Sequence, residues 1–351
     1  MSQKIPVAVL AATGSVGQRF VQLLDHHPLF EVAVVTASDR TVGQKYSQAC
    51  HWILPGDMPA WAADLTLQPT DPANAALPLA FSALPADAAL DLEPAFARAG
   101  TVVCSNASAF RSEPDVPILL PEVNPQQVEI LAAQRRRRAW SGAIVTNSNC
   151  TSTGMTVALK ALQNAFGLRR VFAVSMQALS GAGYPGVSAL DIVDNVIPFI
   201  KGEEEKVEWE PRKMLGEVRG DEIALADFEI SAHTNRVAVV DGHMVCLSVE
   251  LGRKAAPEEA ARVLAAYQAP ESSRGLPSAP HPVIVVRGEA DRPQPRLDRM
   301  TGGGMATVVG RVRRDPLFDL KLVVYSHNTI RGAAGGSIYN AELLHRLGVL
   351  S

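Results

Sequence analysis

The sequence lacks several features that would point to whole classes of protein. No apolar run approaches the roughly 18 to 20 residues that are needed to span a bilayer. The N-terminus MSQKIPVAVL has no charged segment followed by an apolar core and a cleavage site. The formal net charge is only −3 in 351 residues, which argues against a broad surface for nucleic acid or membrane. We therefore expect a cytoplasmic protein with neither kind of partner.

Cysteine is also scarce, with four residues in the whole chain. So few cysteines in a chain of this length do not form a disulfide framework. There is no C-x-x-C pair and no His-x-His cluster, so the sequence predicts no metal site. Cys104 and Cys246 lie in strand-like apolar runs and are expected to be buried thiols.

The first part of the chain alternates strand-like and helix-like patterns. A helical stripe over 15–27 separates two apolar runs, 5–10 and 30–38, which is typical of a βαβ unit. Asn124 is expected to cap a helix over 125–138 with Pro125 at its first position. Further strands are expected at 79–84, 101–105 and 143–147. This alternation predicts an α/β, doubly wound nucleotide-binding domain with a parallel sheet over residues 1–149.

Beyond residue 149 the strands become longer and alternate more clearly between apolar and polar residues. Fewer helices separate them, which favours an α+β domain with a mostly antiparallel sheet covered on one face. We place this domain at 150–329, before a last helix near 332–347. The expected strands are 171–179, 244–251, 305–313 and 320–325.

The loop AATGSVG, residues 11–17, joins the first strand to the first helix. Gly14 and Gly17 would let the backbone turn and approach a pyrophosphate at the helix N-terminus. The pattern falls short of G-x-G-x-x-G because Ala11 and Ala12 take the early positions. A tight turn without a ligand therefore stays open as an alternative.

The end of the second strand, TASDRTVG at 36–43, bears on the choice of cofactor. An acidic residue there would bind the ribose 2′-hydroxyl of NAD, and an arginine would accept the 2′-phosphate of NADP. Arg40 with the hydroxyls of Ser38 and Thr41 favours NADP, whereas Asp39 keeps NAD open.

The stretch TNSNCTSTG, residues 146–154, places Cys150 where an expected strand ends and an expected helix begins. A helix N-terminus lowers the pKa of a thiol, and Asn149 or Ser148 could cap that helix. Arg236 and His243 flank what reads as a short apolar strand and a turn, and they could hold a substrate anion and serve the thiol. From these residues alone, an inert turn cysteine and a structural histidine remain open.

Several motif blocks are spread over nearly the whole chain. In chain order they are ATGSVGQRF (12–20), SNASAFR (105–111), PEVN (121–124), SNCTSTG (148–154), MQALSGAGYPGV (176–187), NVIPFIKGEEEK (195–206), HTNRVAVVDGH (233–243) and HNTIRGAAGGSIYNAELL (327–344). Together these blocks resemble those of aspartate-semialdehyde dehydrogenases, in the branch typical of archaea and fungi. The chain departs from that pattern at Ala11, where the family usually has glycine.

The resemblance implies a role for each matching residue. Cys150 is the expected nucleophile, His243 its acid/base partner, and Gln177 orients the acyl intermediate. Arg236 would hold the substrate α-carboxylate and Glu203 its amino group. Lys206, Asn106 and Arg111 are the expected phosphate-binding residues. The expected NADP-binding residues are Thr13, Gly14, Ser15, Val16, Ser38, Arg40, Thr41, Ser82, Ser180, Gly181 and Asn328.

The implied activity is the NADPH-dependent reductive dephosphorylation of L-4-aspartyl phosphate to aspartate semialdehyde, through a cysteine thioester, in lysine, methionine and threonine biosynthesis. The resemblance also implies a homodimer, or a homotetramer, and a C-terminal helix, 330–351, that completes the first domain. Two alternatives stay open: a malonyl-CoA reductase on the same scaffold and a non-catalytic NADP-binding sensor. Taken alone, GEEEK (202–206) reads as a solvated charge run. The resemblance assigns Glu203 and Lys206 and leaves Glu204 and Glu205 at the surface.

Overall fold

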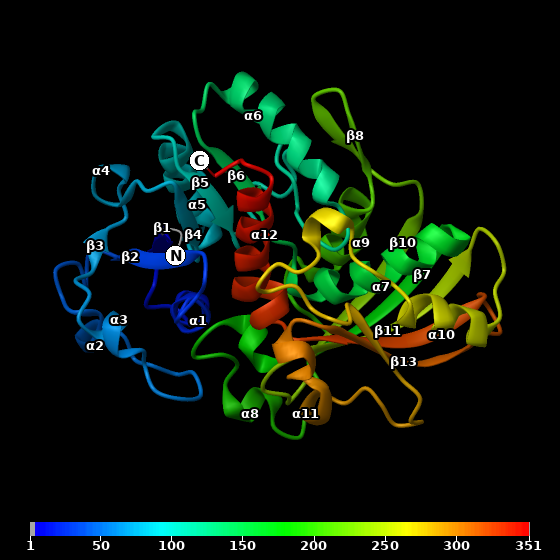
Figure 1. Cartoon of the computed structure of the whole chain (residues 1–351). Coiled ribbons are helices and arrows are strands. Elements are labelled where there is room, and N and C mark those ends of the chain that lie inside the picture. Colours follow the sequence, from blue (N-terminus) through cyan, green and yellow to red (C-terminus); the bar gives the residue numbers. More distant parts are fainter. Residues whose placement is uncertain (1–3, 351) are drawn as a thin grey trace.

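The computed structural model describes residues 4–350 and contains two six-stranded sheets side by side (Figure 1). All pairings in the first sheet are parallel, in the order β3-β2-β1-β4-β5-β6. This strand order confirms the doubly wound, nucleotide-binding architecture. The strands are β1 (Ile5–Leu10), β2 (Phe30–Ala37), β3 (Gln68–Pro69), β4 (Leu79–Ser82), β5 (Val102–Ser105) and β6 (Ala143–Thr146).

Both faces of the first sheet are buried, which explains its nearly continuous apolar strands. In β1, Val7 and Val9 point into one core while Ala8 and Leu10 point into another, as the two-residue period of a strand requires. Helix α1 (Ser15–Leu23) covers the first of these faces and α5 (Ala86–Arg98) the second.

The second sheet is mixed, in the order β10-β7-β11-β14-β13-β12. Strand β11 pairs antiparallel with β7 and β14, and β13 pairs antiparallel with β14, whereas the outer pairs β10–β7 and β12–β13 are parallel. The strands are β7 (Leu168–Gln177), β10 (Glu229–Arg236), β11 (His243–Leu251), β12 (Ile284–Arg287), β13 (Thr307–Arg314) and β14 (Leu320–Ser326); a separate hairpin is formed by β8 (Glu217–Arg219) and β9 (Glu222–Ala224).

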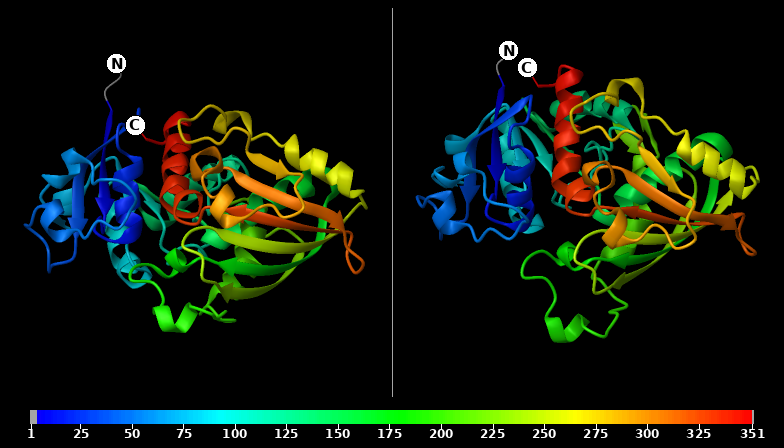
Figure 2. Two further views of the ribbon diagram at one scale, coloured as in Figure 1. Left: turned by 90° about the horizontal axis from the view of Figure 1, so that it is seen from below. Right: turned by 60° about the horizontal axis from the view of Figure 1, so that its bottom comes forward.

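Helices cover only one face of the second sheet (Figure 2). The long helix α7 (Cys150–Phe166) packs there with α9 (Glu203–Met214) and α10 (Pro257–Ala265). Side chains that point to the other face, such as Phe172, Val174 and Met176 of β7, stay half-buried. Cys246 lies on that open face of β11 and is also half-buried, so the expectation of a buried thiol was wrong for Cys246 and right for Cys104.

The remaining helices are short or lie in connections between the sheets. They are α2 (Tyr46–Ala49), α3 (Ala60–Ala63), α4 (Pro72–Ala75), α6 (Ile130–Arg138), α8 (Ala189–Ile192), α11 (Pro295–Asp298), and the 3-10 turns η1 (Pro125–Glu129), η2 (Leu179–Ala182), η3 (Glu271–Ser273) and η4 (Thr301–Gly304). Between residues 4 and 350, no helix is long and apolar enough to cross a membrane.

The end of the chain returns from the second sheet to the first. After β14 a π-helical turn, η5 (Ile330–Ala334), leads into α12 (Gly335–Arg346), which stands between the two halves in Figure 1. Tyr339, Leu343 and Leu344 of α12 are fully buried in the core that also holds Val7 and Phe20. The domain boundaries at 149/150 and 329/330 stay a prediction.

Two helix starts or ends differ from those expected from the sequence. The helix expected over 15–27 ends at Leu23. The helix expected over 125–138 begins as a 3-10 turn, and Asn124 does not cap it with its side chain. The reason is that the Asn124 amide is used elsewhere: its oxygen accepts the Leu120 N–H, and its nitrogen donates to Ile118 and Gln127.

Candidate active site

The loop between β1 and α1 brings backbone N–H groups to the carboxyl edge of the first sheet. Ala11 adopts a left-handed conformation, with φ of 57°, and so takes the turn usually assigned to glycine. A Cβ on Gly17 would lie 2.4 Å from the Ala11 carbonyl oxygen and 2.6 Å from the Ala12 backbone. Gly17 therefore permits the close helix–strand approach that leaves the start of α1 open to a phosphate.

The residues expected to select the cofactor follow β2 at the same edge. Ser38, Asp39 and Arg40 are exposed, and a turn that closes from the Thr41 N–H to the Ser38 carbonyl groups them. A guanidinium and two hydroxyls beside one another suit a 2′-phosphate. Ser82, by contrast, is fully buried at the end of β4, and its hydroxyl accepts the Leu84 N–H.

Cys150 is the first residue of α7, in the place that the sequence predicted. Asn149 is the N-cap, and its side-chain oxygen accepts the N–H groups of Thr151 and Ser152 at 2.9 and 3.1 Å. Ser148, the other capping candidate, instead pairs with the Thr153 hydroxyl. The cap fixes the direction of the first helical turn and, with it, the position of the thiol.

His243 lies against the thiol. Its Nε2 is 3.1 Å from Cys150 Sγ, and its Nδ1 accepts the Ala178 backbone N–H at 3.1 Å. Because Nδ1 accepts, the hydrogen of the neutral ring is on Nε2 and faces the sulfur. Burial, together with the positive charge of Arg236, lowers the pKa of His243 to about 3, so the ring stays neutral at physiological pH.

Arg236 and His243 do not flank one strand, as the sequence had suggested. Arg236 is the last residue of β10 and His243 the first of β11, and a loop joins them. Both strands pair with β7, which ends at Gln177 and lies between them. The sheet therefore collects the three side chains at one end.

Glu203 begins α9 and is nine-tenths buried next to the helix cap of Cys150. Its carboxylate accepts both hydrogen bonds of the Asn149 amide at 2.8 and 3.0 Å, one from Gln177 at 3.3 Å and one from the Lys206 ammonium at 3.3 Å. Two other predicted site residues, Gln177 and Lys206, therefore meet on this carboxylate.

Charges around Cys150 act on its pKa in opposite directions. Burial raises the pKa of this thiol above its usual range, and the negative charge of Glu203 adds to that effect. Arg111 and Arg236 oppose it, as does the backbone N–H of Cys150 itself. In the free protein, burial therefore favours the thiol over the thiolate.

A cavity of about 340 Å³ joins these elements. It places the thiol of Cys150 between the nucleotide loop and the residues expected to bind phosphate. Of the predicted site residues, its walls include Ser15, Val16, Asn106, Arg111, Cys150, Ser180, Gly181, Glu203, Lys206 and Asn328. Asn328 donates to the Ser180 hydroxyl at 2.8 Å, which ties two of the predicted cofactor residues together.

Several residues that shape this cavity were missed from the sequence. A Cβ on Gly332 would lie 2.9 Å from Cys150 Cβ, so the π-helical turn packs directly on the cysteine. Asn147 donates to Asn106 and to the Ala333 carbonyl, which joins that turn to the first sheet. Glu210 and Lys213 extend the charged face of α9. Their spacing of seven and ten residues from Glu203 was a usable signal.

Within residues 4–350, no group of three or more His, Cys, Asp or Glu could hold a metal ion.

A buried acid lies below the cofactor edge and provides a test of the packing there. Glu93 of α5 is fully buried and accepts the Ser105 hydroxyl at 2.6 Å. Burial raises its pKa to about 7, although Ser105, Ser82 and Arg111 oppose the shift. The native state therefore binds this proton more tightly than the unfolded chain, and the resulting stability is lost as pH rises from the ordinary pKa of a glutamate to about 7.

We expect Glu93→Gln to remove this loss. The melting temperature of the variant minus that of the unchanged protein should be about 2–4 °C larger at pH 8 than at pH 5. Calorimetry at the two pH values measures this difference. Asp91→Asn, on the exposed face of the same helix, should show no such difference. An equal shift at both pH values would contradict the assignment.

A nucleotide-binding parallel sheet, an adjacent mixed sheet, and a Cys–His pair at their junction together define the class of two-domain semialdehyde dehydrogenases. The chain matches the family models described as "Semialdehyde dehydrogenase, NAD binding domain" over residues 6–131 and "Semialdehyde dehydrogenase, dimerisation domain" over residues 159–331. It is an oxidoreductase of that class.

Relatives that match over nearly their full length show which family within this class the chain belongs to. The chain is 51% identical to the aspartate-semialdehyde dehydrogenase of Archaeoglobus fulgidus, over 96% of this chain and 97% of the relative. It is 45% identical to that of Schizosaccharomyces pombe, over 98% and 99%. The crystal structure of the Candida albicans enzyme with NADP superposes with a TM-score of 0.91, at 39% identity, covering 99% of this chain and 100% of that one. The chain belongs to the aspartate-semialdehyde dehydrogenase family, which confirms the resemblance seen in its motifs.

Proposed function

We propose that the protein reduces L-4-aspartyl phosphate to aspartate semialdehyde with NADPH, reversibly, in the biosynthesis of lysine, methionine and threonine. The observation that carries this function is the position of Cys150. The thiol lies at a helix start, 3.1 Å from His243, in a cavity shared with the nucleotide loop. Its relatives from archaea and fungi are named for the same activity.

Residues at the junction would hold the NADP that the reaction needs. The start of α1 behind Gly17 suits the pyrophosphate, and Arg40 with Ser38 and Thr41 suits the 2′-phosphate. Ser180, Gly181 and Asn328 line the cavity on the side of Cys150. When bound, NADPH supplies the hydride that reduces the thioester carbonyl.

The first chemical step is attack of the Cys150 sulfur on the acyl carbon, during which the thiol proton passes to the departing phosphate. The carbon–sulfur bond forms, the bond from carbon to the phosphate oxygen breaks, and inorganic phosphate leaves. Lys206, Asn106 and Arg111 bind the phosphate. Gln177, through its contact with Glu203, orients the thioester that remains.

His243 serves the second step as the acid/base partner. Reduction of the thioester places negative charge on the carbonyl oxygen. The Cys150 backbone N–H, one of the first N–H groups of α7 and therefore without an intrahelical acceptor, is the proposed donor to it. The Nε2–H of His243 faces the same atoms. The carbon–sulfur bond then breaks, the aldehyde leaves and the sulfur is released as a thiolate.

Arg236 and Glu203 select the amino-acid end of the substrate. Arg236 is nearly buried at the end of β10, and one of its amino groups donates to the Ala178 carbonyl at 2.7 Å. The rest of its planar guanidinium suits a carboxylate, while Glu203 suits an ammonium group.

Arg236→Lys should therefore raise the KM for aspartate semialdehyde by about 10-fold with a smaller change in kcat. A lysine keeps the charge but cannot form the two parallel hydrogen bonds, and a lost charge-assisted bond is worth about 1.5–3 kcal/mol. Steady-state kinetics measures both constants. The exposed Arg253, which pairs with Glu259, provides the control Arg253→Lys. An unchanged KM would remove Arg236 from the carboxylate site.

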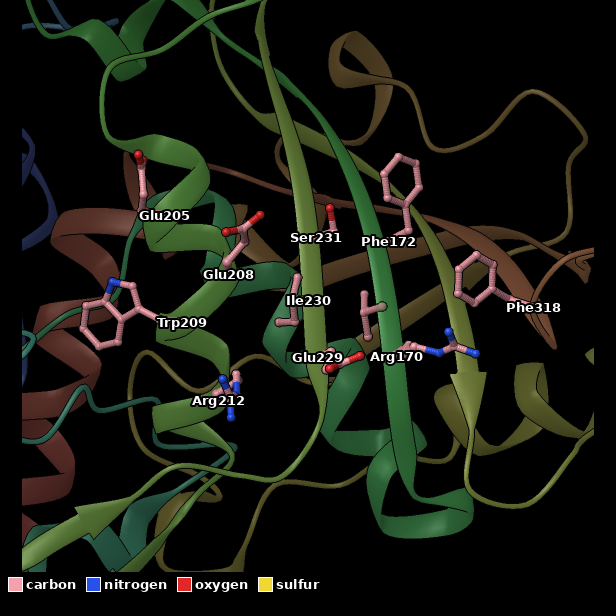
Figure 3. A pocket seen from close by; sticks show the side chains of 11 residues that line it. Arg170, Phe172, Glu205, Glu208, Trp209, Arg212, Glu229, Ile230, Ser231 and Phe318 are labelled. Atoms are coloured by element: carbon pink, nitrogen blue, oxygen red, sulfur yellow. The ribbon is translucent and has the colours of Figure 1, made fainter.

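The dimerisation domain contains the open face of the second sheet, and we propose that a second copy covers it to form a homodimer. Phe172 lies there, edge to face with His233 at 5.6 Å between ring centroids. A hollow of about 580 Å³ continues along the edge between β7, β10 and α9, and includes Trp209 and Ile230 (Figure 3). The mass in solution tests this proposal, and a mass of four chains would indicate the homotetramer.

An assay of the purified protein tests the activity itself. Aspartate semialdehyde, phosphate and NADP should together give NADPH, with little product when phosphate is left out. NAD in place of NADP should be the poorer cofactor. Malonyl-CoA reduction without any turnover of aspartate semialdehyde would overturn the proposal, and so would cofactor binding without turnover of either substrate.

A further inference from the structure

Helix α9 presents a row of four charged residues to the interior of the protein. Glu203, Lys206, Glu210 and Lys213 follow one another at intervals of three and four residues, which places them on one side of the helix. The first two line the cavity beside Cys150. The other two lie one and two turns further along and are fully or almost fully buried, so their charges need partners.

Glu210 joins two segments that the sequence places far apart. One carboxylate oxygen accepts the backbone N–H of Asn149, the cap of the Cys150 helix, at 2.5 Å. The other accepts a guanidinium N–H of Arg111 at 3.0 Å. A single buried carboxylate thereby connects the start of α7 to an arginine that lines the cavity.

Lys213 holds the same arginine by its main chain. Its ammonium donates to the carbonyl oxygens of Arg111 at 2.7 Å and of Glu113 at 2.5 Å. The second amino group of Arg111 donates to the Asn106 carbonyl at 2.8 Å. Arg111 is therefore fixed both by its side chain and by its backbone.

We propose that Glu210 and Lys213 are positioning residues that fix Arg111 relative to Cys150, and so set the affinity of the site for phosphate. This inference rests on the proposed function, in which Arg111 binds the phosphate that leaves or attacks. Neither residue reaches the cavity wall, so both act through Arg111. The contacts of Glu210 and Lys213 hold α9 against the loop after β5. They thereby keep Arg111 at a fixed distance from Cys150.

Glu210→Gln is the most direct test, since an amide has one oxygen to accept where the carboxylate has two. Either the Arg111 side chain or the Asn149 N–H loses its partner. A lost partner at a buried charge corresponds to a change of roughly 10-fold to 100-fold in binding. We expect the KM for phosphate to rise by that factor in the phosphorylating direction, while the KM for aspartate semialdehyde and the Kd of NADP stay close to those of the unchanged protein.

Glu208→Gln is the matched control. Glu208 is on the same helix and its carboxylate also accepts a backbone N–H, that of Ala232 in β10 at 3.0 Å, away from Arg111. Its phosphate KM should not change. Lys213→Met provides a second, independent variant, because it removes the contacts with the Arg111 and Glu113 carbonyls and leaves Glu210 in place. It should raise the same KM.

Three results would overturn the inference while the unchanged protein and the control remain active, two of them kinetic. One is a phosphate KM that stays within about 2-fold of normal in folded Glu210→Gln, below the effect of a single lost hydrogen bond. The other is an equal rise of the KM for both substrates, which indicates a general loss of structure. If neither variant folds, the pair is structural and the inference also fails. An unchanged protein that shows no phosphate-dependent turnover would instead overturn the proposed function.

Discussion

Cys150→Ala should abolish turnover while leaving NADP binding largely intact. Loss of a covalent nucleophile lowers kcat on the order of 10⁴-fold to 10⁶-fold, and here none of the other three cysteines lines the cavity to replace the sulfur. Stopped-flow reduction and fluorescence titration with NADP measure the two effects separately. Appreciable residual reductase activity would contradict the assignment of Cys150 as the nucleophile.

The other cysteines provide the control for this experiment. Cys50 is buried in the core of the first half, so Cys50→Ala should keep its turnover. Alkylation of Cys150 should become faster with pH, by about tenfold per unit while the thiol form predominates, because its pKa is raised by burial and by Glu203. A rate of alkylation that does not depend on pH near 7 would show that the thiolate already predominates.

His243→Ala should have the second largest effect, lowering kcat by about 10²-fold to 10⁴-fold, the usual contribution of a positioned proton donor or acceptor. The ring is neutral, is held by the Ala178 N–H and points its Nε2–H at the sulfur. The variant loses this donor, which contacts the sulfur before the first step and faces the carbonyl oxygen in the second. Single-turnover measurement of thioester formation and of its reduction would show whether both become slower.

His243→Gln separates the donor from the titrating group. An amide can donate a hydrogen bond but cannot exchange a proton near neutral pH, so its activity should fall between that of His243→Ala and the unchanged protein. His51 lies in the first half, outside the cavity, and His51→Gln should not alter kcat. If His243→Ala had no effect on kcat, the histidine would be structural.

Much of the fold follows from local patterns in the sequence. The apolar runs of β1 and β2 on either side of α1, and the small residues of 11–17 between them, predict a βαβ unit because both the period and the turn chemistry agree. Asn149 was one of two residues predicted to cap α7, and its side chain does so. The same reasoning was wrong for Asn124, because its amide bonds to Leu120 and Gln127 instead, and tertiary contacts decide that competition.

Only part of the site could be predicted from the residues themselves. Arg236 and His243 looked like the ends of one strand, because the sequence cannot show that β7 lies between β10 and β11. The family resemblance supplied the roles of Glu203 and Lys206, which a charge pattern alone assigns to the surface. Glu210 and Gly332 were missed because their partners, Arg111 and Cys150, are 99 and 182 positions away in the chain.

Helix α12 has a consequence for how the chain is made. It contributes to the core of the first sheet, yet it is synthesised after the whole of the second sheet. Until it emerges, the core that holds Val7 and Phe20 lacks Tyr339, Leu343 and Leu344, so the nucleotide-binding half is completed only after the second half has been made. The order of synthesis therefore does not allow the first domain to fold completely before the second has been made. The half that binds the cofactor therefore gains its full core only after the chain that carries Cys150 has been made.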